Sequence, residues 1–406
     1  MLFKREKYLK KIRPFYNTDM IKVLTGIRRC GKSSIMQLIK KELAESGVPE
    51  KDLIYLDLDK RGNKNIKTAD ALEEKIDSLI CDDDFKYLFI DEVQNVEGFE
   101  EVINAFNTDG NISIFLTGSN SYLLSGEIAT KLTGRYLEFE IFTLDFSEYL
   151  EMKTFKKLDA SNDLTAEFTE YIINGGFPKA LDFDDISARR FYTKNVISEI
   201  FEKDIKRNKK IRNRLVFERV QNYVINNFGA TFSVNSLFDY FNNVDHTPIS
   251  KETIRKYVSI LTKAKILYEC PRFDCKSKKT LSGEQKYYLA DLSIYFMNVT
   301  DNRINYGPVL ENLIYIYLLE SGYSVSVGRI GKLECDFIVR KTNDYRYIQV
   351  SMSIGNRETE EREFRPFYQI KDNYPKYLLT LDTLLQQRDG IEHKNIINVL
   401  SQNIQL

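Results

Sequence analysis

A glycine-bounded segment that ends in lysine and serine is the part of the sequence whose residue types most clearly predict chemistry. It reads GIRRCGKSS and fits the spacing G-x-x-x-x-G-K-[ST]. Glycines let the backbone turn so that successive N–H groups point inward and bind phosphate. In such a loop the lysine reaches the β- and γ-phosphates of a nucleotide, and the hydroxyl residue ligates Mg²⁺. We therefore expect a phosphate-binding loop here.

The whole phosphate-binding loop is expected to line the nucleotide. Its predicted cofactor-binding residues are Gly26, Ile27, Arg28, Arg29, Cys30, Gly31, Lys32, Ser33 and Ser34. Lys32 is also predicted to be catalytic, and Ser33 is predicted to be a metal ligand. The two arginines are not expected to be catalytic, because side chains at the x positions project away from the phosphates. They are candidates for reporting the state of the site to the rest of the molecule.

Two adjacent carboxylates, Asp91 and Glu92, follow an apolar run in YLFIDEVQN. Asp91 is expected to hold Mg²⁺, and Glu92 is expected to polarise the attacking water as a general base. An apolar strand that ends in two acids is common, but its place about 60 residues after the phosphate-binding loop makes it specific. The glutamate, and the lack of an NKxD guanine-reading motif in the sequence, favour ATP over GTP.

Two further polar residues, Asn120 and Arg135, could complete a catalytic site. Asn120 ends the run LTGSN, where it is predicted to orient water; a strand-terminating turn is an equal alternative. Arg135 follows Gly134 and could reach the γ-phosphate held by a neighbouring subunit in a ring or dimer. A surface arginine that caps the preceding helix is the alternative, and the oligomeric state is left open.

Alternating short apolar runs and amphipathic stretches predict the elements that position these residues. Five strands are expected, at 21–25, 53–59, 87–91, 112–118 and 136–142. The helical patterns between them predict an α/β fold with a parallel five-stranded sheet that is covered on both faces.

The rest of the chain is expected to form three further domains. Residues 151–210 have a helical pattern interrupted by NGGFP, and residues 211–300 predict three helices and a basic hairpin, which indicates a winged helix-turn-helix. Helix and strand patterns follow to the end. The predicted divisions are 1–150, 151–210, 211–300 and 301–406.

Four motifs, GIRRCGKSS, FIDEVQN, LTGSN and LTGRYLEFEIFTLDFSEYL, carry a family resemblance. Together they resemble the AAA+-type P-loop ATPases of bacteria and archaea that carry a winged helix and a carboxy-terminal restriction-endonuclease-like domain. The resemblance covers nearly the whole chain and implies an ATPase core, a helical lid, a winged helix and a nuclease-like domain, in that order. NGGFPKA resembles the Gly-x-Pro lid motif of related ATPases, which implies that Gly176 and Pro178 approach the bound nucleotide.

The nuclease-like end departs from the pattern that nuclease chemistry needs. That pattern requires a carboxylate on a helix, an aspartate on a strand and [DE]-x-K on the next strand, so that Mg²⁺ and water are activated. Glu311 and Asp336 occupy the first two places, but Gln349 and Ser351 stand at the third. Because a charge and the lysine are missing, we expect the fold to be kept and the chemistry to be lost.

Basic residues gather in the predicted winged helix, at Lys251, Arg255, Lys256 and Lys263 of its third helix and at Lys276, Lys278 and Lys279 of its wing. Double-stranded DNA, held through its phosphates, is one interpretation. The other is a solvated face on a domain that only relays nucleotide state.

Bulk composition argues against several functional classes. Lys+Arg and Asp+Glu both number 59, so nothing draws the whole chain to nucleic acid or to acidic membranes. Only two histidines argue against a zinc site or a histidine-based nucleophile system. Five scattered cysteines, and apolar runs too short to span a bilayer, predict a reduced, cytoplasmic protein without a membrane partner.

The sequence as a whole predicts Mg²⁺-dependent ATP binding and hydrolysis, in which Glu92 activates water. Hydrolysis would drive a conformational switch of the lid and winged helix. A nucleotide-dependent binding switch with little turnover and an ATP-gated nuclease are the alternatives.

Overall fold

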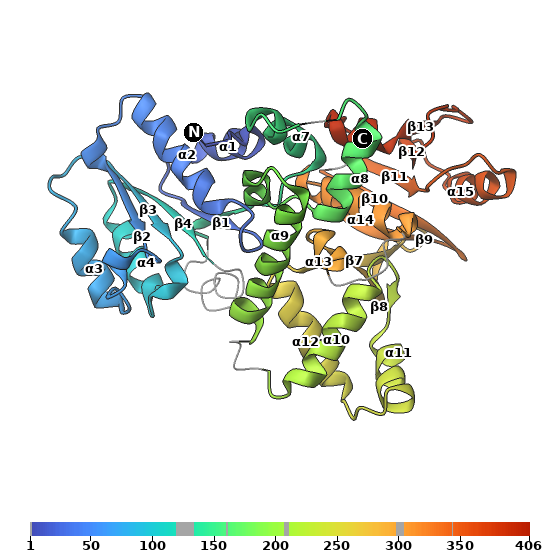
Figure 1. The fold of residues 1–406 in the computed structure, drawn as a ribbon, viewed down its shortest axis with the longest axis horizontal. Coiled ribbons are helices and arrows are strands. Elements are labelled where there is room, and N and C mark those ends of the chain that lie inside the picture. The colour runs from blue at the N-terminus through green and yellow to red at the C-terminus, as the bar shows by residue number, and fades with distance from the viewer. Residues whose placement is uncertain (1, 119–133, 160, 207–210, 298–303, 343) are drawn as a thin grey trace. The chain divides into compact units, whose positions relative to one another are not determined.

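The computed structural model describes all residues except 1, 119–133, 160, 207–210, 298–303 and 343 (Figure 1). The chain divides into two compact units, residues 1–143 and 144–406, which are described separately. Among the described residues, the helices are too short or too polar for any of them to cross a lipid bilayer.

The first unit is built on a parallel five-stranded sheet in the order β2-β3-β4-β1-β5. Its strands are β1 (Ile21–Thr25), β2 (Leu53–Asp57), β3 (Lys86–Asp91), β4 (Ile112–Thr117) and β5 (Tyr136–Glu140). The predicted parallel five-stranded sheet is therefore confirmed. The second and fifth strands end at Asp57 and Glu140, two residues before their predicted ends at 59 and 142, although the Leu58 and Ile141 N–H groups still donate to the neighbouring strands.

The sheet order decides which helices cover which face. The helices are α1 (Glu6–Ile12), α2 (Lys32–Glu45), α3 (Ala69–Asp77) and α4 (Phe99–Asp109). The connection from β1 to β2 runs toward one edge of the sheet, past the positions of β4 and β3. The connections from β2 to β3 and from β3 to β4 run in the opposite direction, each to the neighbouring strand. Since crossover connections are right-handed, α2 lies on one face and α3 and α4 on the other (Figure 1). Both faces of the sheet are thus covered, as predicted.

A buried lysine, Lys22, lies on β1, between β4 and β5 in the sheet. Its side chain is fully buried, and its ammonium donates to Ser113 Oγ at 2.6 Å and to the Thr18 carbonyl at 3.1 Å. Burial lowers the pKa of Lys22 to about 7, because the charged form is poorly solvated there.

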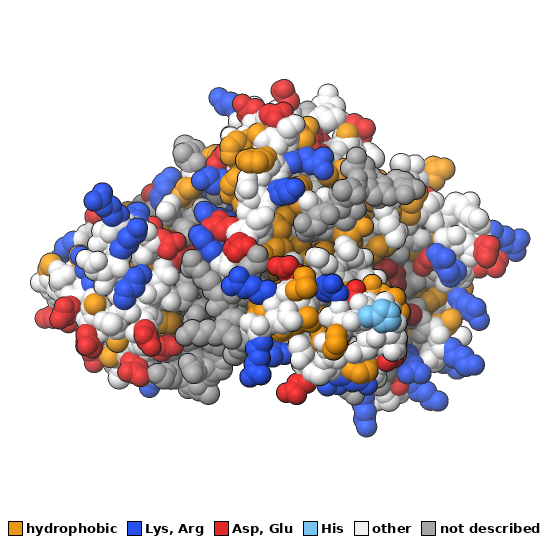
Figure 2. Space-filling view, turned by 60° about the horizontal axis from the view of Figure 1, so that its bottom comes forward, with side chains coloured by type: hydrophobic (Ala, Val, Ile, Leu, Met, Phe, Trp, Pro, Cys, Tyr) orange, Lys and Arg blue, Asp and Glu red, His pale blue; other side chains and the backbone are white. Residues whose placement is uncertain are grey.

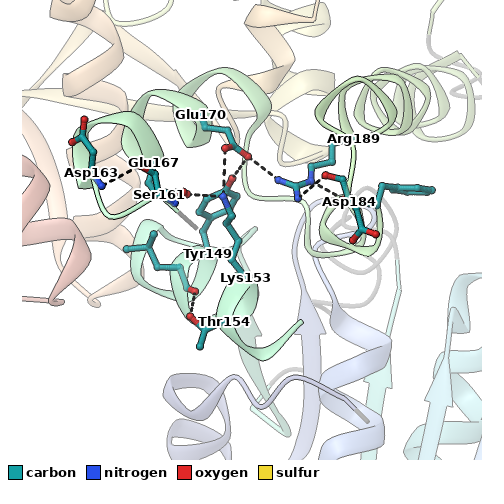
Figure 3. A network of polar contacts seen from close by, with 11 residues as sticks. Tyr149, Lys153, Thr154, Ser161, Asp163, Glu167, Glu170, Asp184 and Arg189 are labelled. Atoms are coloured by element: carbon teal, nitrogen blue, oxygen red, sulfur yellow. Dashed lines mark hydrogen bonds and ion pairs between the residues drawn. The ribbon is translucent and has the colours of Figure 1, made fainter. Parts of the chain in front are cut away.

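The second unit begins with three helices that a polar network joins. They are α7 (Phe146–Phe155), α8 (Leu164–Asn174) and α9 (Ile186–Ile200). The Lys153 ammonium, almost fully buried, lies 2.7 Å from Glu167 and 3.4 Å from Glu170. Glu170 also accepts hydrogen bonds from Tyr149 and Arg189, both at 2.7 Å (Figure 3). Each charge in the network therefore has a partner on another helix.

Three more helices and a hairpin follow at the predicted places. They are α10 (Arg214–Asn226), α11 (Val234–Asp239), α12 (Lys251–Lys263), β7 (Leu267–Asp274) and β8 (Lys279–Leu289), with the short strand β6 (Thr231–Phe232). The elements expected over 211–300 are present, while their assignment as a winged helix stays a prediction.

The strands of the carboxy-terminal part share a sheet with this hairpin. The elements of this part are α13 (Ser293–Phe296), α14 (Tyr306–Glu320), β9 (Ser324–Ile330), β10 (Leu333–Lys341), β11 (Asp344–Val350), α15 (Arg357–Gln369), β12 (Lys376–Thr380), β13 (Ile391–Asn395) and α16 (Ile396–Ser401). The eight-stranded order is β13-β12-β11-β10-β9-β7-β8-β6, and β7 pairs parallel with β9. The sheet therefore continues across the expected division at 300.

The buried ammonium of Lys22 predicts a pH-dependent stability. An unfolded lysine titrates near its ordinary pKa of about 10.4, whereas folded Lys22 titrates at about 7. Between these two values the unfolded chain binds more protons, so the free energy of unfolding should rise with pH in this window. Lys22→Met should be more stable than the parent at pH 7, by roughly a few kcal/mol.

The measurement is urea unfolding of the parent and the variant between pH 7 and 10. The advantage of Lys22→Met should shrink as the pH rises. The matched control is Lys41→Met, which removes an exposed lysine of α2. A constant difference between Lys22→Met and the parent across this range would contradict the assignment.

Candidate nucleotide site

The carboxyl ends of three neighbouring strands gather the predicted site residues of the first unit. All five strands are parallel, so their carboxyl ends share one edge of the sheet. The phosphate-binding loop follows β1, Asp91 ends β3, and Thr117 ends β4, which lies between the other two strands. The strand order therefore places a threonine between the loop and the carboxylates.

The two glycines of the loop occupy conformations that other residues rarely adopt. Gly26 has φ +133° and Gly31 has φ +107°, and Gly31 immediately precedes α2. A Cβ on Gly26 would lie 2.0 Å from the carbonyl oxygen of Ile141, so no side chain fits there. The two positions thus need glycine, as the sequence motif predicts, while phosphate binding by the loop stays a prediction.

The side chains of the loop divide by burial. Ile27 and Cys30 are buried in the core, so their backbone is what they offer to a ligand, and burial raises the pKa of the Cys30 thiol. Arg28 is half-buried, whereas Arg29 and Ser34 are exposed. The predicted nucleotide contacts of these five residues remain predictions.

Lys32 folds back over its own loop. Its ammonium donates to the carbonyl oxygen of Gly26 at 2.9 Å and to that of Ile27 at 3.2 Å, and the residue is 6% exposed. The charge is therefore held at the loop by main-chain oxygens, which phosphate oxygens could replace.

Ser33 and Asp91, the two predicted metal ligands, lie together. Ser33 Oγ donates to Asp91 Oδ1 at 3.0 Å, although the two residues are 58 positions apart in the sequence. Thr117 Oγ1 donates to the same carboxylate oxygen, and Tyr55 donates to Asp91 Oδ2 at 3.2 Å. Asp91 is buried, so this hydroxyl cage stabilises its charge and fixes its orientation.

Glu92 has an unusual backbone next to this cage. Its φ and ψ are +59° and +47°, the left-handed region, which is uncommon for residues with a side chain. Its N–H donates to Thr117 Oγ1 at 3.1 Å, and its carboxylate accepts a hydrogen bond from the Gln94 amide. The two adjacent carboxylates therefore have different partners, an amide for Glu92 and hydroxyl groups for Asp91.

Thr117 and Tyr55 were not among the predicted site residues. Thr117 stands in LTGSN, the run in which the sequence predicts Asn120 as the functional residue. Asn120 lies outside the described residues, and its role stays a prediction. Tyr55 is an ordinary strand residue in the sequence. Its contact with Asp91 follows from the pairing of β2 with β3, which the sequence pattern does not specify.

Arg135 lies at the opposite edge of the sheet from the phosphate-binding loop. It directly precedes β5, and its carbonyl oxygen accepts from the Ile21 N–H at the start of β1. Its exposed guanidinium donates to Asn104 at 2.6 Å and to Thr108 at 3.0 Å, both on α4. Within this unit it is distant from the loop, and a role at the site of a neighbouring subunit stays a prediction.

Gly176 and Pro178 belong to the second unit. The Gly176 N–H donates to Asp291 Oδ2 at 2.8 Å, and its carbonyl oxygen accepts from the Leu144 N–H at 2.7 Å. Pro178 opens a 3₁₀ turn (Pro178–Asp182). Their predicted approach to a nucleotide is untested.

The residues of the nuclease-like pattern form a second polar cluster. Glu311 on α14 accepts hydrogen bonds from Lys286 at 3.0 Å and from Tyr288 at 2.9 Å, both on β8. Lys286 also lies 3.0 Å from Glu334. The lysine that lies among these carboxylates therefore comes from β8, whereas the nuclease pattern would place its lysine on β11.

Asp336 and Gln349 are joined through backbone and side chain. Gln349 Oε1 accepts from the Asp336 N–H at 2.7 Å, and its amide donates to Glu363 at 2.9 Å. Asp336 accepts from the Val350 N–H at 2.8 Å. Burial and the charge of Glu311 raise the pKa of Asp336 well above its usual range. The structure thus brings the three predicted residues together, and Gln349 acts as a hydrogen-bonding link between its neighbours.

Two family models and two relatives match large parts of the chain. Residues 18–150 match a family model described as an AAA domain, and residues 165–302 match a domain of unknown function (DUF8612). An uncharacterized protein of Haemophilus influenzae is 32% identical over 404 residues, which cover 99% of each chain. An uncharacterized protein of Methanocaldococcus jannaschii is 31% identical over 365 residues, covering 87% of this chain and 79% of its own.

Among solved structures, a Walker-type ATPase of Pyrococcus abyssi is similar in fold. Its TM-score is 0.51 at 18% identity, over 73% of this chain and 95% of that one. The AAA-domain match spans the phosphate-binding loop, Asp91 and Glu92. With relatives at 32% and 31% identity that cover most of its length, the chain belongs to the same family as the Haemophilus and Methanocaldococcus proteins, and its residues 18–150 match an AAA domain.

Proposed function

We propose that this protein binds ATP with Mg²⁺ and hydrolyses it at the carboxyl edge of the first sheet. The observation that carries the proposal is the 3.0 Å contact between Ser33 Oγ and Asp91 Oδ1. A loop hydroxyl and a strand-end carboxylate are the two protein ligands that hold Mg²⁺ in P-loop ATPases. Their meeting in the folded chain supports the same use here.

The donor set fits Mg²⁺. Hydroxyl and carboxylate oxygens are hard ligands, and Mg²⁺ takes one or two of them together with waters and phosphate oxygens. Bound there, the ion would neutralise charge that develops on the phosphates. Tyr55 and Thr117 hold the Asp91 carboxylate in one orientation, so the ligand is positioned in advance.

The remaining roles are assigned to residues of this unit. Lys32 would exchange the carbonyl oxygens of Gly26 and Ile27 for β- and γ-phosphate oxygens. Glu92 would accept the proton of the attacking water, and Thr117 fixes the backbone of Glu92 relative to Asp91. Asn120 is proposed to orient the water, and Arg135 to serve the site of a neighbouring copy in a homo-oligomer.

The second unit is proposed to respond to the nucleotide. Residues 151–210 would form a helical lid that includes Gly176 and Pro178. Residues 211–300 would act as a winged helix. Residues 301–406 are proposed to be a restriction-endonuclease-like domain without nuclease activity, because Gln349 replaces a charged ligand and links Asp336 to Glu363. We place the protein in the cytoplasm as part of the same proposal.

Replacing Glu92 tests hydrolysis directly. Glu92→Gln keeps the size of the side chain but removes the base, so turnover of ATP should fall by about 10²- to 10⁴-fold. Binding of a fluorescent ATP analogue should remain, since the loop, Ser33 and Asp91 are intact. The measurement is phosphate release together with fluorescence titration.

The matched control is Glu97→Gln, which changes an exposed glutamate just beyond the same turn. Its turnover should equal that of the parent protein. Parent-like phosphate release by Glu92→Gln would contradict the assignment of the base. Failure of the parent to bind nucleotide would contradict the proposed function itself.

A second candidate function, binding of double-stranded DNA, is favoured by the exposed face of α12. Its four cations, Lys251, Arg255, Lys256 and Lys263, are all exposed, and so are Lys276, Lys278 and Lys279 at the hairpin turn. Basic and acidic side chains otherwise mix over the surface that Figure 2 shows, in keeping with 59 of each in the chain. A local basic face of this kind would contact phosphates rather than base edges.

Salt dependence tests this second function. Affinity for a short duplex, measured by fluorescence anisotropy, should fall steeply between about 50 and 200 mM salt. Arg255→Ala/Lys256→Ala should weaken binding and reduce the salt slope by about 2, one for each lost phosphate contact. The control Lys332→Ala/Lys371→Ala removes two exposed lysines elsewhere in this unit and should leave the slope unchanged. A salt-independent affinity would contradict the DNA proposal.

A further inference from the structure

The backbone where the two units join is held on both sides. The first unit ends at Thr143 and the second begins at Leu144. We call these two residues the junction, and residues 141–143 the exit segment. Each contact described below lies within one unit, and the peptide bond between Thr143 and Leu144 is the covalent connection.

A buried arginine near the start of the chain holds the first side. Arg5 is 4% exposed, and its Nη1 donates to the carbonyl oxygen of Cys30 at 3.0 Å and to that of Phe142 at 2.9 Å. Its Nη2 donates to the Thr143 carbonyl oxygen at 3.1 Å. One rigid guanidinium thus joins the phosphate-binding loop to the exit segment.

Two further hydrogen bonds and one close approach fix the position of the exit segment. The Ile141 N–H donates to the Thr25 carbonyl oxygen at 2.9 Å, and the Ile141 carbonyl lies where Gly26 leaves no room for a Cβ. The Tyr8 hydroxyl accepts from the Phe142 N–H at 3.1 Å. The exit segment is therefore held against the end of β1, the first glycine of the loop and Tyr8 of α1.

On the other side, Leu144 is held by the glycine of NGGFP. Its N–H donates to the Gly176 carbonyl at 2.7 Å, and its carbonyl oxygen accepts from Tyr171 at 2.9 Å. A Cβ on Gly176 would lie 2.2 Å from the Leu144 carbonyl oxygen, which accounts for glycine there. The Gly176 N–H in turn donates to Asp291, which follows β8. Thr143 is thus held by Arg5 and the next residue, Leu144, by Gly176, and both partners are distant from the junction in sequence.

Nucleotide binding would change the conformation of the loop near Cys30, the residue that Arg5 contacts. The Ile27 carbonyl oxygen accepts both the Lys32 ammonium at 3.2 Å and the Cys30 N–H at 3.3 Å. When Lys32 moves to phosphate oxygens, this carbonyl loses its charged donor and the turn through Cys30 can relax. Arg5 would pass that movement to Thr143, because the same guanidinium holds both carbonyls.

We propose that Arg5 is a positioning residue of the nucleotide site and that it transmits occupancy of the phosphate-binding loop to the junction. The signal then reaches Leu144 through one peptide bond and the NGGFP turn through Gly176. This inference rests on the proposed binding of ATP and adds to it a residue that the nucleotide motifs do not contain.

Amide hydrogen exchange of the full-length chain tests the coupling, with and without Mg²⁺ and a non-hydrolysable ATP analogue. In the parent, the analogue should slow exchange in peptides that cover 26–34 and 140–146. In Arg5→Gln, peptide 26–34 should still be protected, while protection of 140–146 should be lost. In turnover assays KM should rise about tenfold with kcat near the parent value, since Arg5 acts on the loop through a main-chain carbonyl.

Arg13→Gln is the matched control. Arg13 lies on the same amino-terminal segment but pairs with Glu6 and Glu42, so both protections should persist in this variant. Arg5→Lys keeps the charge with fewer donors in a different geometry, and should restore part of the junction protection. If circular dichroism shows that Arg5→Gln does not fold, Arg5→Lys replaces it in the exchange experiment.

The outcomes separate the two claims. If the parent gains no protection in 26–34, the proposed nucleotide binding fails. If 26–34 is protected but 140–146 is not, the coupling fails while binding stands. Protection of 140–146 that is unchanged in Arg5→Gln, or in Arg5→Lys where that variant carries the test, would show that Arg5 only supports the fold and would overturn the proposal.

Discussion

The order of the parallel strands, in which β4 lies between β1 and β3, is the constraint on which the candidate site depends. It brings Ser33, Asp91 and Thr117 to one edge of the sheet from three separate parts of the chain. Hydroxyl groups then surround a buried carboxylate and stabilise its charge, because hydrogen bonds to an ionised group are stronger than neutral ones. Without that strand order, the loop and the carboxylates would be two unrelated motifs.

The same unit uses buried cations for a second purpose, which is to connect main-chain segments. Lys32 holds the carbonyl oxygens of its own loop, and Arg5 joins that loop to the exit segment. In the second unit, Lys153 of α7 pairs with two carboxylates of α8, and Lys286 of β8 pairs with carboxylates of α14 and β10. Since removing one partner of a buried charge pair is costly, these contacts restrict how each element can move.

Sequence patterns predicted the parts of the structure that depend on local information. The five strands follow from apolar runs, and the loop and carboxylates follow from motif spacing. Local patterns do not identify Tyr55 and Thr117, because their contacts with Asp91 depend on the strand order. They do not identify Arg5 either, because its partners are main-chain carbonyls, which every residue has. The pairing of β7 with β9, and the arrival of Lys286 beside Glu311, depend likewise on which strands meet.

The central claim is that Ser33 and Asp91 form a Mg²⁺-dependent ATP site. Its most direct measurement is the affinity for ATP by calorimetry with Mg²⁺ and with a chelator, in the parent and in Asp91→Asn. The account predicts that Mg²⁺ strengthens ATP binding by the parent and that this dependence is lost in the variant. ATP binding by the parent that is equally strong without Mg²⁺, or that is absent in both conditions, would contradict it.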